Sequence, residues 1–201
     1  MIRVLLAEDQ ELVRGAMAAL LSLEPDIEVV AEVGRGDQVV PAAAASRPDV
    51  ALLDIEMPGS DGITAAAELR RRLPACRVLM LTTFGRPGYL RRAMVSGASG
   101  FMLKDAPAAD LAVAIRRTIA GERVVDPQLA IQALAVGESP LSTREAEVLA
   151  ASADGASVAA VAKRLFLSEG TVRNHLSAAI QKLDARNRTE AARLAEERGW
   201  L

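Results

Sequence analysis

The sequence predicts an α/β protein with a doubly wound, five-stranded parallel sheet, followed by an all-α domain of four helices. Over residues 1–120, short apolar runs alternate with segments of helical spacing, and this alternation is typical of a parallel sheet covered by helices. From Leu141 onward the strand signals stop, and only helical patterns remain through residues 141–201. The intervening residues 121–140 contain scattered glycine and proline, so we interpret them as a linker.

Five apolar runs predict the strands of the sheet. They cover residues 2–7, 27–33, 49–54, 77–81 and 100–103. The third run is apolar from Val50 to Leu53 and ends in Asp54, as expected for a strand that is buried on both faces. Acids interleave the second run, which indicates a strand nearer the edge. We expect the strand order 2-1-3-4-5, a common arrangement in doubly wound sheets.

Helices are predicted between the strands from apolar spacing and from breaking residues. They cover residues 11–22, 37–46, 62–73, 86–96 and 107–120, with a further short helix at 129–136 in the linker. Pro25 and Pro48 stop the first two, because proline lacks the backbone donor that a continuing helix needs. Pro58 and Gly59 turn the chain soon after Asp54, since proline fixes φ and glycine tolerates a positive φ. Asp54 is therefore expected at the end of a central strand.

The second part of the chain begins with a capping box. Ser142 precedes Glu145 by three residues, and in this motif each side chain accepts a hydrogen bond from the other residue's backbone N–H. Four helices are predicted, over residues 142–155, 157–165, 168–183 and 187–198. The short turn at Phe166 and Leu167 joins the second helix to the third, which is the pattern of a helix-turn-helix.

Composition and charge limit the class of protein. No apolar run reaches the ~20 residues of a membrane span and no secretory leader precedes the first strand, so we expect a cytoplasmic protein with no membrane association. Cys76 is the only cysteine and His175 the only histidine, which excludes an intrachain disulfide and a histidine-rich metal site. The net charge is −2, yet residues 163–193 carry seven basic and three acidic residues. This local surplus favours a nucleic-acid partner.

Polar side chains stand where the predicted strands end. They are Glu8 and Asp9 after the first strand, Asp54 on the third, Thr82 after the fourth and Lys104 after the fifth. Open α/β sheets bind ligands at this edge. The carboxylates suit a hard cation such as Mg²⁺, and Asp54 would attack a phosphoryl group as a nucleophile. Lys104 would neutralise the phosphoryl oxygens and the Thr82 hydroxyl would hydrogen-bond one of them.

These residues give the predicted sheet a resemblance to the receiver domain of response regulators. The acidic pair, Asp54 within Asp-Ile-Glu-Met-Pro-Gly, Thr82, and Lys104 within Lys-Asp-Ala-Pro match the motif of that family. The resemblance implies that residues 1–120 form a receiver domain in which Asp54 accepts the phosphoryl group. It also implies that Lys104 and Thr82 assist the transfer.

The same resemblance implies a cofactor and a switch. The implied Mg²⁺ ligands are Asp9, Asp54, Glu8 through a water molecule, and the main-chain carbonyl of Glu56. The implied switch pair is Thr82 with Phe101. Family members often carry tyrosine at the position of Phe101. Phenylalanine has no hydroxyl to anchor it, but it can still turn inward.

Residues 141–201 resemble the four-helix output domain of NarL/FixJ (LuxR-type) regulators. The matching motifs are Leu-Ser-Thr-Arg-Glu-Ala-Glu-Val-Leu from Leu141, Gly-Thr-Val-Arg-Asn-His-Leu from Gly170, and Lys-Leu-Asp-Ala-Arg-Asn-Arg-Thr-Glu-Ala from Lys182. The resemblance implies a two-component transcription regulator that a sensor histidine kinase phosphorylates, and that then pairs as a homodimer. Further motifs, among them Ala-Glu-Asp-Gln, resemble the DesR-like branch, which implies a DesK-like kinase and control of membrane-lipid genes.

The third helix of the output domain is the expected DNA reader. Val172, Leu176, Ala179 and Leu183 recur at helical spacing and form the predicted buried stripe. The residues expected on the DNA-facing side are Thr171, Arg173, Asn174, Ser177 and Lys182. Arginine pairs with guanine and asparagine with adenine in the major groove of double-stranded DNA, whereas Thr171 and Lys182 suit phosphates. His175 is as well explained by packing as by a phosphate contact.

Two other classes of function share some of these residues. An Mg²⁺-dependent phosphatase with an aspartyl nucleophile would use Asp54 as well, with Glu56 as its acid–base group, but the turn that follows leaves no room for a cap domain. A protein-interaction module would use the four helices alone, but the basic stretch and the pair Arg173 and Asn174 argue against it. We therefore expect a regulator and not an enzyme.

Overall fold

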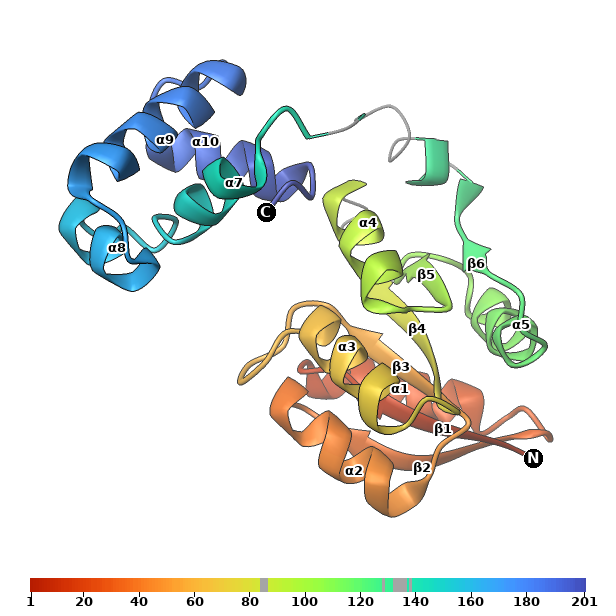
Figure 1. Ribbon diagram of the computed structural model, residues 1–201. Coiled ribbons are helices and arrows are strands. Elements are labelled where there is room, and N and C mark those ends of the chain that lie inside the picture. The colour runs from red at the N-terminus through yellow and green to blue at the C-terminus, as the bar shows by residue number, and fades with distance from the viewer. Residues whose placement is uncertain (84–86, 128, 132–136, 138) are drawn as a thin grey trace. The chain divides into compact units, whose positions relative to one another are not determined.

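The computed structural model describes the chain except for residues 84–86, 128, 132–136 and 138 (Figure 1). The chain forms two compact units, one of residues 1–85 and 90–130 and the other of residues 86–89 and 131–201. The predicted helix at 129–136 and the predicted start of the helix at 86–96 lie partly outside the described residues. No helix of the described part is long and apolar enough to cross a membrane.

The first unit is a parallel sheet flanked by helices. Its strands are β1 (Ile2–Ala7), β2 (Ile27–Val33), β3 (Val50–Asp54), β4 (Arg77–Thr82), β5 (Gly100–Leu103) and β6 (Val124–Val125). Its helices are α1 (Glu11–Leu21), the 3-10 turn η1 (Gly36–Gln38), α2 (Val39–Ser46), α3 (Gly62–Arg72), α5 (Ala108–Ile119) and, from residue 90 onward, α4 (Pro87–Ser96). The strand order is β2-β1-β3-β4-β5-β6, so the predicted order of the first five strands is confirmed, with β2 at the edge.

The predicted number of five strands is wrong, because the described sheet has six. The sixth strand, β6, pairs in parallel with β5, so that Val124 lies opposite Gly100 and Val125 opposite Phe101. Two residues are too few to show the alternation by which strands are recognised. They also lie in the stretch that the sequence predicts as a linker, so the sheet continues into that stretch.

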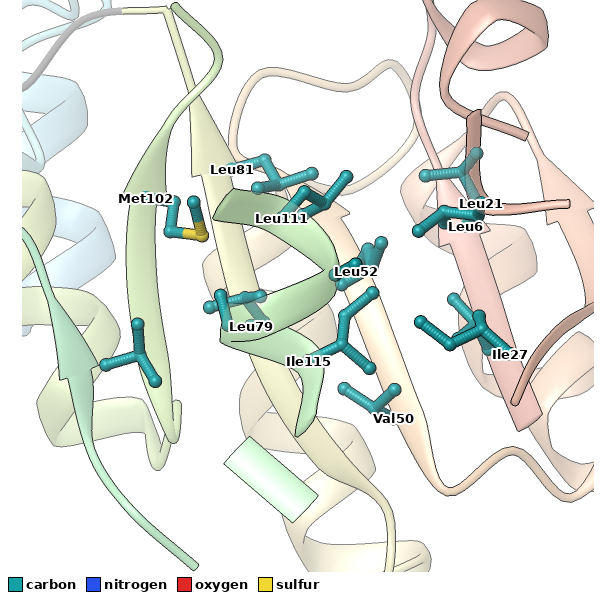
Figure 2. Packing of buried hydrophobic residues seen from close by; sticks show 14 residues of the cluster. Leu6, Leu21, Ile27, Val50, Leu52, Leu79, Leu81, Met102, Leu111 and Ile115 are labelled. Atoms are coloured by element: carbon teal, nitrogen blue, oxygen red, sulfur yellow. The ribbon is translucent and has the colours of Figure 1, made fainter. Parts of the chain in front are cut away.

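The core of the sheet is aliphatic, and β3 lies in its centre with all five residues buried. On one face, side chains of β1, β3 and β4 pack against α1 and α5 (Figure 2). Leu52 of β3, Leu111 and Ile115 of α5 and Leu21 of α1 belong to this cluster. Parallel strands covered on both faces leave little polar surface except at their ends. The strand ends are therefore where chemistry can be placed.

The second unit contains four described helices, α7 (Thr143–Ala150), α8 (Val158–Leu165), α9 (Glu169–Lys182) and α10 (Arg188–Glu197). Each begins at a residue whose side chain accepts a backbone N–H of the first turn; these N-caps are Ser142, Ser157, Ser168 and Asn187. Both hydrogen bonds of the predicted capping box are present. The predicted stripe of α9 is also confirmed, because all four of its members are buried.

Candidate functional site

Three carboxylates meet at the carboxyl edge of the sheet. Glu8, Asp9 and Asp54 each offer an oxygen, and these oxygens lie within 4.8 Å of one another. The cause is the register of the central strands, since Ala7 at the end of β1 pairs with Leu53 of β3. Glu8 is 1% and Asp54 5% exposed, whereas Asp9 is exposed. Three hard oxygen donors at this separation fit a divalent cation such as Mg²⁺.

Lys104 lies between two of these acids. Its Nζ is 2.5 Å from Oε2 of Glu8 and 3.0 Å from Oδ2 of Asp54. Its backbone N–H donates to the carbonyl of Thr82 at 2.8 Å, so the end of β4 helps to position it. The other oxygen of Asp54, Oδ1, accepts the N–H of Ile55 at 2.8 Å. The predicted nucleophile and the predicted lysine are thus in direct contact.

Burial and charge act in opposite directions on this cluster. Burial raises the pKa of Asp54 and of Glu8, and the hydrogen bond from Lys104 offsets only part of that rise. Burial also lowers the pKa of Lys104, but its hydrogen bonds to Glu8 and Asp54 outweigh burial and leave it raised. Lys104 therefore stays a cation. One cation against three acids leaves an excess of negative charge, which an added cation would neutralise.

The predicted switch residues lie on neighbouring strands. Thr82 ends β4 and is buried, and Phe101 of β5 is fully buried. Phe101 stands opposite Met80 of β4 and Val125 of β6. Because Phe101 is fully buried, its ring lies in the core and not at the surface. The strand that carries it, β5, adjoins β6. Glu56 is exposed in the turn after β3, as its predicted main-chain role allows.

A residue that the sequence reading missed is Gly62, the first residue of α3. A Cβ there would lie 1.9 Å from the carbonyl oxygen of Asp54, so no other residue fits without moving the backbone. The Gly62 N–H donates to the carbonyl of Ile55 at 2.9 Å, and Asp61 caps the helix by accepting the N–H of Thr64. The helix start is thus pressed against the strand end that carries Asp54. In the sequence, the feature that could have indicated this close approach is the glycine directly after the helix cap Asp61.

On α9, Arg173, Asn174 and Ser177 are exposed as predicted, and Thr171 is half-buried. Arg173 is held by an ion pair with Glu169 one turn earlier, with Nη2 and Oε2 2.6 Å apart. Both side chains are about half exposed, so this is a weak surface pair. The hydroxyl groups of Thr171 and of the N-cap Ser168 form a hydrogen bond with each other.

Lys182 has an intramolecular partner that the sequence did not reveal. Its Nζ lies 2.7 Å from Oε2 of Glu145, and the same oxygen accepts the N–H of Ser142 at 2.7 Å. Glu145 is 7% exposed. The pair therefore joins the last turn of α9 to the first turn of α7. A lysine has three donors, so this contact leaves donors for a phosphate.

Most of the other basic side chains near α9 also have partners. Arg164 pairs with Asp154, Arg186 pairs with Glu190, and Arg188 donates to the carbonyl of Ala156. Lys163 is exposed, with no ion pair among the described residues. These contacts support a structural role for the three arginines.

Comparison with known proteins places both units in described families. Residues 4–116 match the family model "Response regulator receiver domain", and residues 139–195 match "Bacterial regulatory proteins, luxR family". The chain is 45% identical to the uncharacterized transcriptional regulatory protein YvfU and 43% identical to the transcriptional regulatory protein DesR, both of Bacillus subtilis, over all of each chain. The structure of the response regulator RcsB in complex with DNA matches with 25% identity and a TM-score of 0.69, over 98% of each chain.

The contact between Glu145 and Lys182 predicts how the stability of the output unit depends on pH. The hydrogen bond from Lys182, followed by that from the Ser142 N–H, lowers the pKa of Glu145. A lowered pKa means that the carboxylate stabilises the fold above its ordinary pKa, and that this contribution is lost as pH falls through the folded-state pKa. Glu145→Gln should therefore lower the Tm at neutral pH and reduce the loss of Tm on acidification.

Fluorescence of Trp200, the only tryptophan, reports this unit alone because it packs on the helical core. Glu147→Gln is the matched control, since Glu147 lies on the same helix in an exposed pair with Arg144. An acid-induced loss of Tm that is as steep in Glu145→Gln as in the unaltered chain would contradict the assignment.

Proposed function

Because this chain belongs to the LuxR-type family of two-component response regulators, we propose that phosphorylation of Asp54 by a sensor histidine kinase controls its binding to duplex DNA. The observation that carries the proposal is the buried contact of Asp54 with Lys104 beside Glu8 and Asp9. We assign residues 1–120 to the receiver, 121–140 to the linker and 141–201 to DNA binding.

Receiver domains generally bind Mg²⁺ in an acidic pocket, and the cluster around Asp54 has the donors for it. We assign the ligands as Asp9, Asp54, Glu8 through water, and the main-chain carbonyl of Glu56. When bound, the cation supplies positive charge against the phosphoryl oxygens. A carboxylate oxygen of Asp54 attacks phosphorus, so a P–O bond forms as the P–N bond of the kinase phosphohistidine breaks. Lys104 then pairs with a phosphoryl oxygen.

Phosphorylation would be transmitted along the strands next to the site. Lys104 directly follows the strand β5, and a phosphoryl group on Asp54 would draw its ammonium away from Glu8. The Thr82 hydroxyl would donate to the phosphoryl group, and Phe101 would take the space that Thr82 vacates. Val125 lies opposite Phe101 in the neighbouring strand. A shift of Phe101 therefore acts on the first residues of the segment that leads to the output unit.

We propose that the phosphorylated receiver binds a second copy through α1 and α5. Both helices pack on the same face of the sheet, and both expose apolar side chains on the outside. The most exposed of these apolar side chains are Leu12 and Leu20 of α1 and Val113 of α5. An isologous pair would bring two copies of α9 to the half-sites of a near-palindromic DNA. Phosphorylation would shift a monomer–dimer equilibrium that exists before it.

In the DNA complex, Arg173 and Asn174 would read bases, Ser177 would lie beside them, and Thr171 and Lys182 would contact phosphates. We place the protein in the cytoplasm, where it meets DNA and the transmitter part of its kinase. The similarity to DesR supports a DesK-like kinase and membrane-lipid genes as the narrower form of the proposal. The identity to YvfU, 45%, is slightly higher than the 43% to DesR, so the regulated genes are best identified from the DNA sequences that the protein selects.

The first prediction concerns phosphorylation. A small phosphodonor such as acetyl phosphate, with Mg²⁺, should add one phosphoryl group to the chain, and Asp54→Asn should abolish it because the amide is no nucleophile. Asp37→Asn is the control, since Asp37 is an exposed aspartate paired with Arg35. Intact-protein mass spectrometry makes the measurement. Asp54→Asn that is phosphorylated as fully as Asp37→Asn would refute the assignment.

The second prediction concerns base reading. Arg173→Ala should weaken binding to the preferred duplex by about 1–3 kcal/mol and relax specificity at one base pair. Arg193→Ala is the matched control, because Arg193 on α10 forms the same kind of i,i+4 ion pair, also at 2.6 Å and of similar exposure. Fluorescence anisotropy with labelled duplexes measures both. Equal losses for the two variants would show that Arg173 reads no base.

The third prediction concerns dimerisation. Sedimentation of the full chain with beryllofluoride, a phosphoryl mimic, should show a larger mass than without it. Val113→Lys on α5 should prevent that increase, because it places a charge in the proposed apolar contact. Val95→Lys is the control, since Val95 is an exposed valine on α4. If Val95→Lys alone blocked the increase, the interface would have to be moved to α4.

A further inference from the structure

Phe166 has the most exposed side chain among the large hydrophobic residues of the described chain. Its relative exposure is 95%. It stands in the turn between α8 and α9, and its φ of 54° is in the left-handed region. Glycine usually takes this position at a helix end, because any Cβ is strained there. A bulky aromatic residue with such a backbone is uncommon, and it points to a function.

The surrounding contacts fix the backbone and leave the ring outside. The N–H groups of Phe166 and Leu167 both donate to the carbonyl of Ala162. Arg144 donates to the carbonyl of Leu165 at 3.1 Å. Leu167 then packs on the helical core, as the residue after a left-handed helix end commonly does. Neither the turn nor the core therefore accounts for phenylalanine at position 166.

We propose that Phe166 is a further DNA-contacting residue, whose ring packs on deoxyribose carbons or a thymine methyl at the edge of the recognition site. It lies two residues before Ser168, the N-cap of α9. In a helix-turn-helix the N-terminal residues of the second helix meet the base edges, so the turn before them lies close to the duplex. Phenylalanine is among the side chains that contact the thymine methyl.

Charge around the turn favours DNA over an apolar protein partner. Lys163, which is exposed and forms no ion pair among the described residues, stands in the last turn of α8 just before Phe166, whereas its neighbour Arg164 is paired with Asp154. A positive side chain beside an apolar ring matches the two surfaces of a duplex edge, its phosphates and its sugars. The inference rests on the proposed DNA binding and adds an apolar, uncharged contact to it.

The experiment separates the strain of the turn from the contact. Phe166→Gly in the full chain should keep or raise the Tm followed by Trp200 fluorescence, because glycine accepts the left-handed backbone. It should at the same time weaken binding of the beryllofluoride-treated chain to a duplex selected from a random pool by about tenfold. Phe166→Tyr, which keeps the ring, should retain most of the affinity.

The salt dependence identifies the kind of contact. Phe166→Gly should leave the slope of log affinity against log salt unchanged, since no phosphate charge is involved. Lys163→Ala should reduce that slope by about 0.9 if Lys163 neutralises one phosphate. Arg47→Gly controls for strain relief alone, because Arg47 of the first unit also has a positive φ, of 47°; it should leave DNA affinity unchanged.

Unchanged affinity of Phe166→Gly for the purified duplex would overturn the proposal, and the exposed ring would then be assigned to a protein partner. A smaller salt slope in that variant would overturn the apolar contact. If the unaltered chain bound no duplex at any salt, the proposed function itself would fail, and with it this inference.

Discussion

The receiver unit depends on one buried cation. The parallel order of β1 and β3 brings Glu8 and Asp54 together where almost no water reaches them. Two carboxylates in that position repel one another and lose their hydration, which costs several kcal/mol unless a cation compensates. Lys104 supplies the compensating charge from the end of β5, which is separated from β3 by β4. The charge of Asp54 is therefore balanced by a side chain that stands directly after β5.

The proposed transmission from the site would rest on this charge balance. The backbone N–H of Lys104 donates to the carbonyl of Thr82, so a hydrogen bond joins the ends of β4 and β5. Phe101 of β5 is fully buried and stands opposite Met80 of β4 and Val125 of β6. In the switch proposed above, the short sixth strand would be the point at which a rearrangement in the core reaches the chain leading to the output unit. A packed core has few alternative arrangements, which favours a switch between discrete states over gradual bending.

The sequence predicted most of what depends on local pattern. Strand ends, helix N-caps and the buried stripe of α9 are set by residues close together along the chain, so Asp54 and Ser142 were placed correctly. The contact of Lys104 with Asp54, although distant along the chain, was also expected, because the strand order brings the strand ends to one edge. Distant contacts that no such topological rule governs could not be predicted. The partner of Lys182 is 37 residues away, and β6 is too short to show alternation. The close fit of Gly62 against Asp54 also needs the folded backbone, because many glycines follow helix caps without such a constraint.

The two ion pairs of α9 divide the helix into a part that can rearrange and a part that is fixed. The pair between Arg173 and Glu169 has half-exposed partners, so opening it costs roughly 0.2–1 kcal/mol. That is less than a good arginine–guanine contact returns, about 1–3 kcal/mol. The pair between Lys182 and Glu145 involves a carboxylate with a side chain only 10% exposed, and breaking it would leave a buried charge unpaired. If Arg173 reads a base as proposed, DNA would draw it away from Glu169, whereas the far end of α9 would keep its attachment to α7 and hold the helix in register.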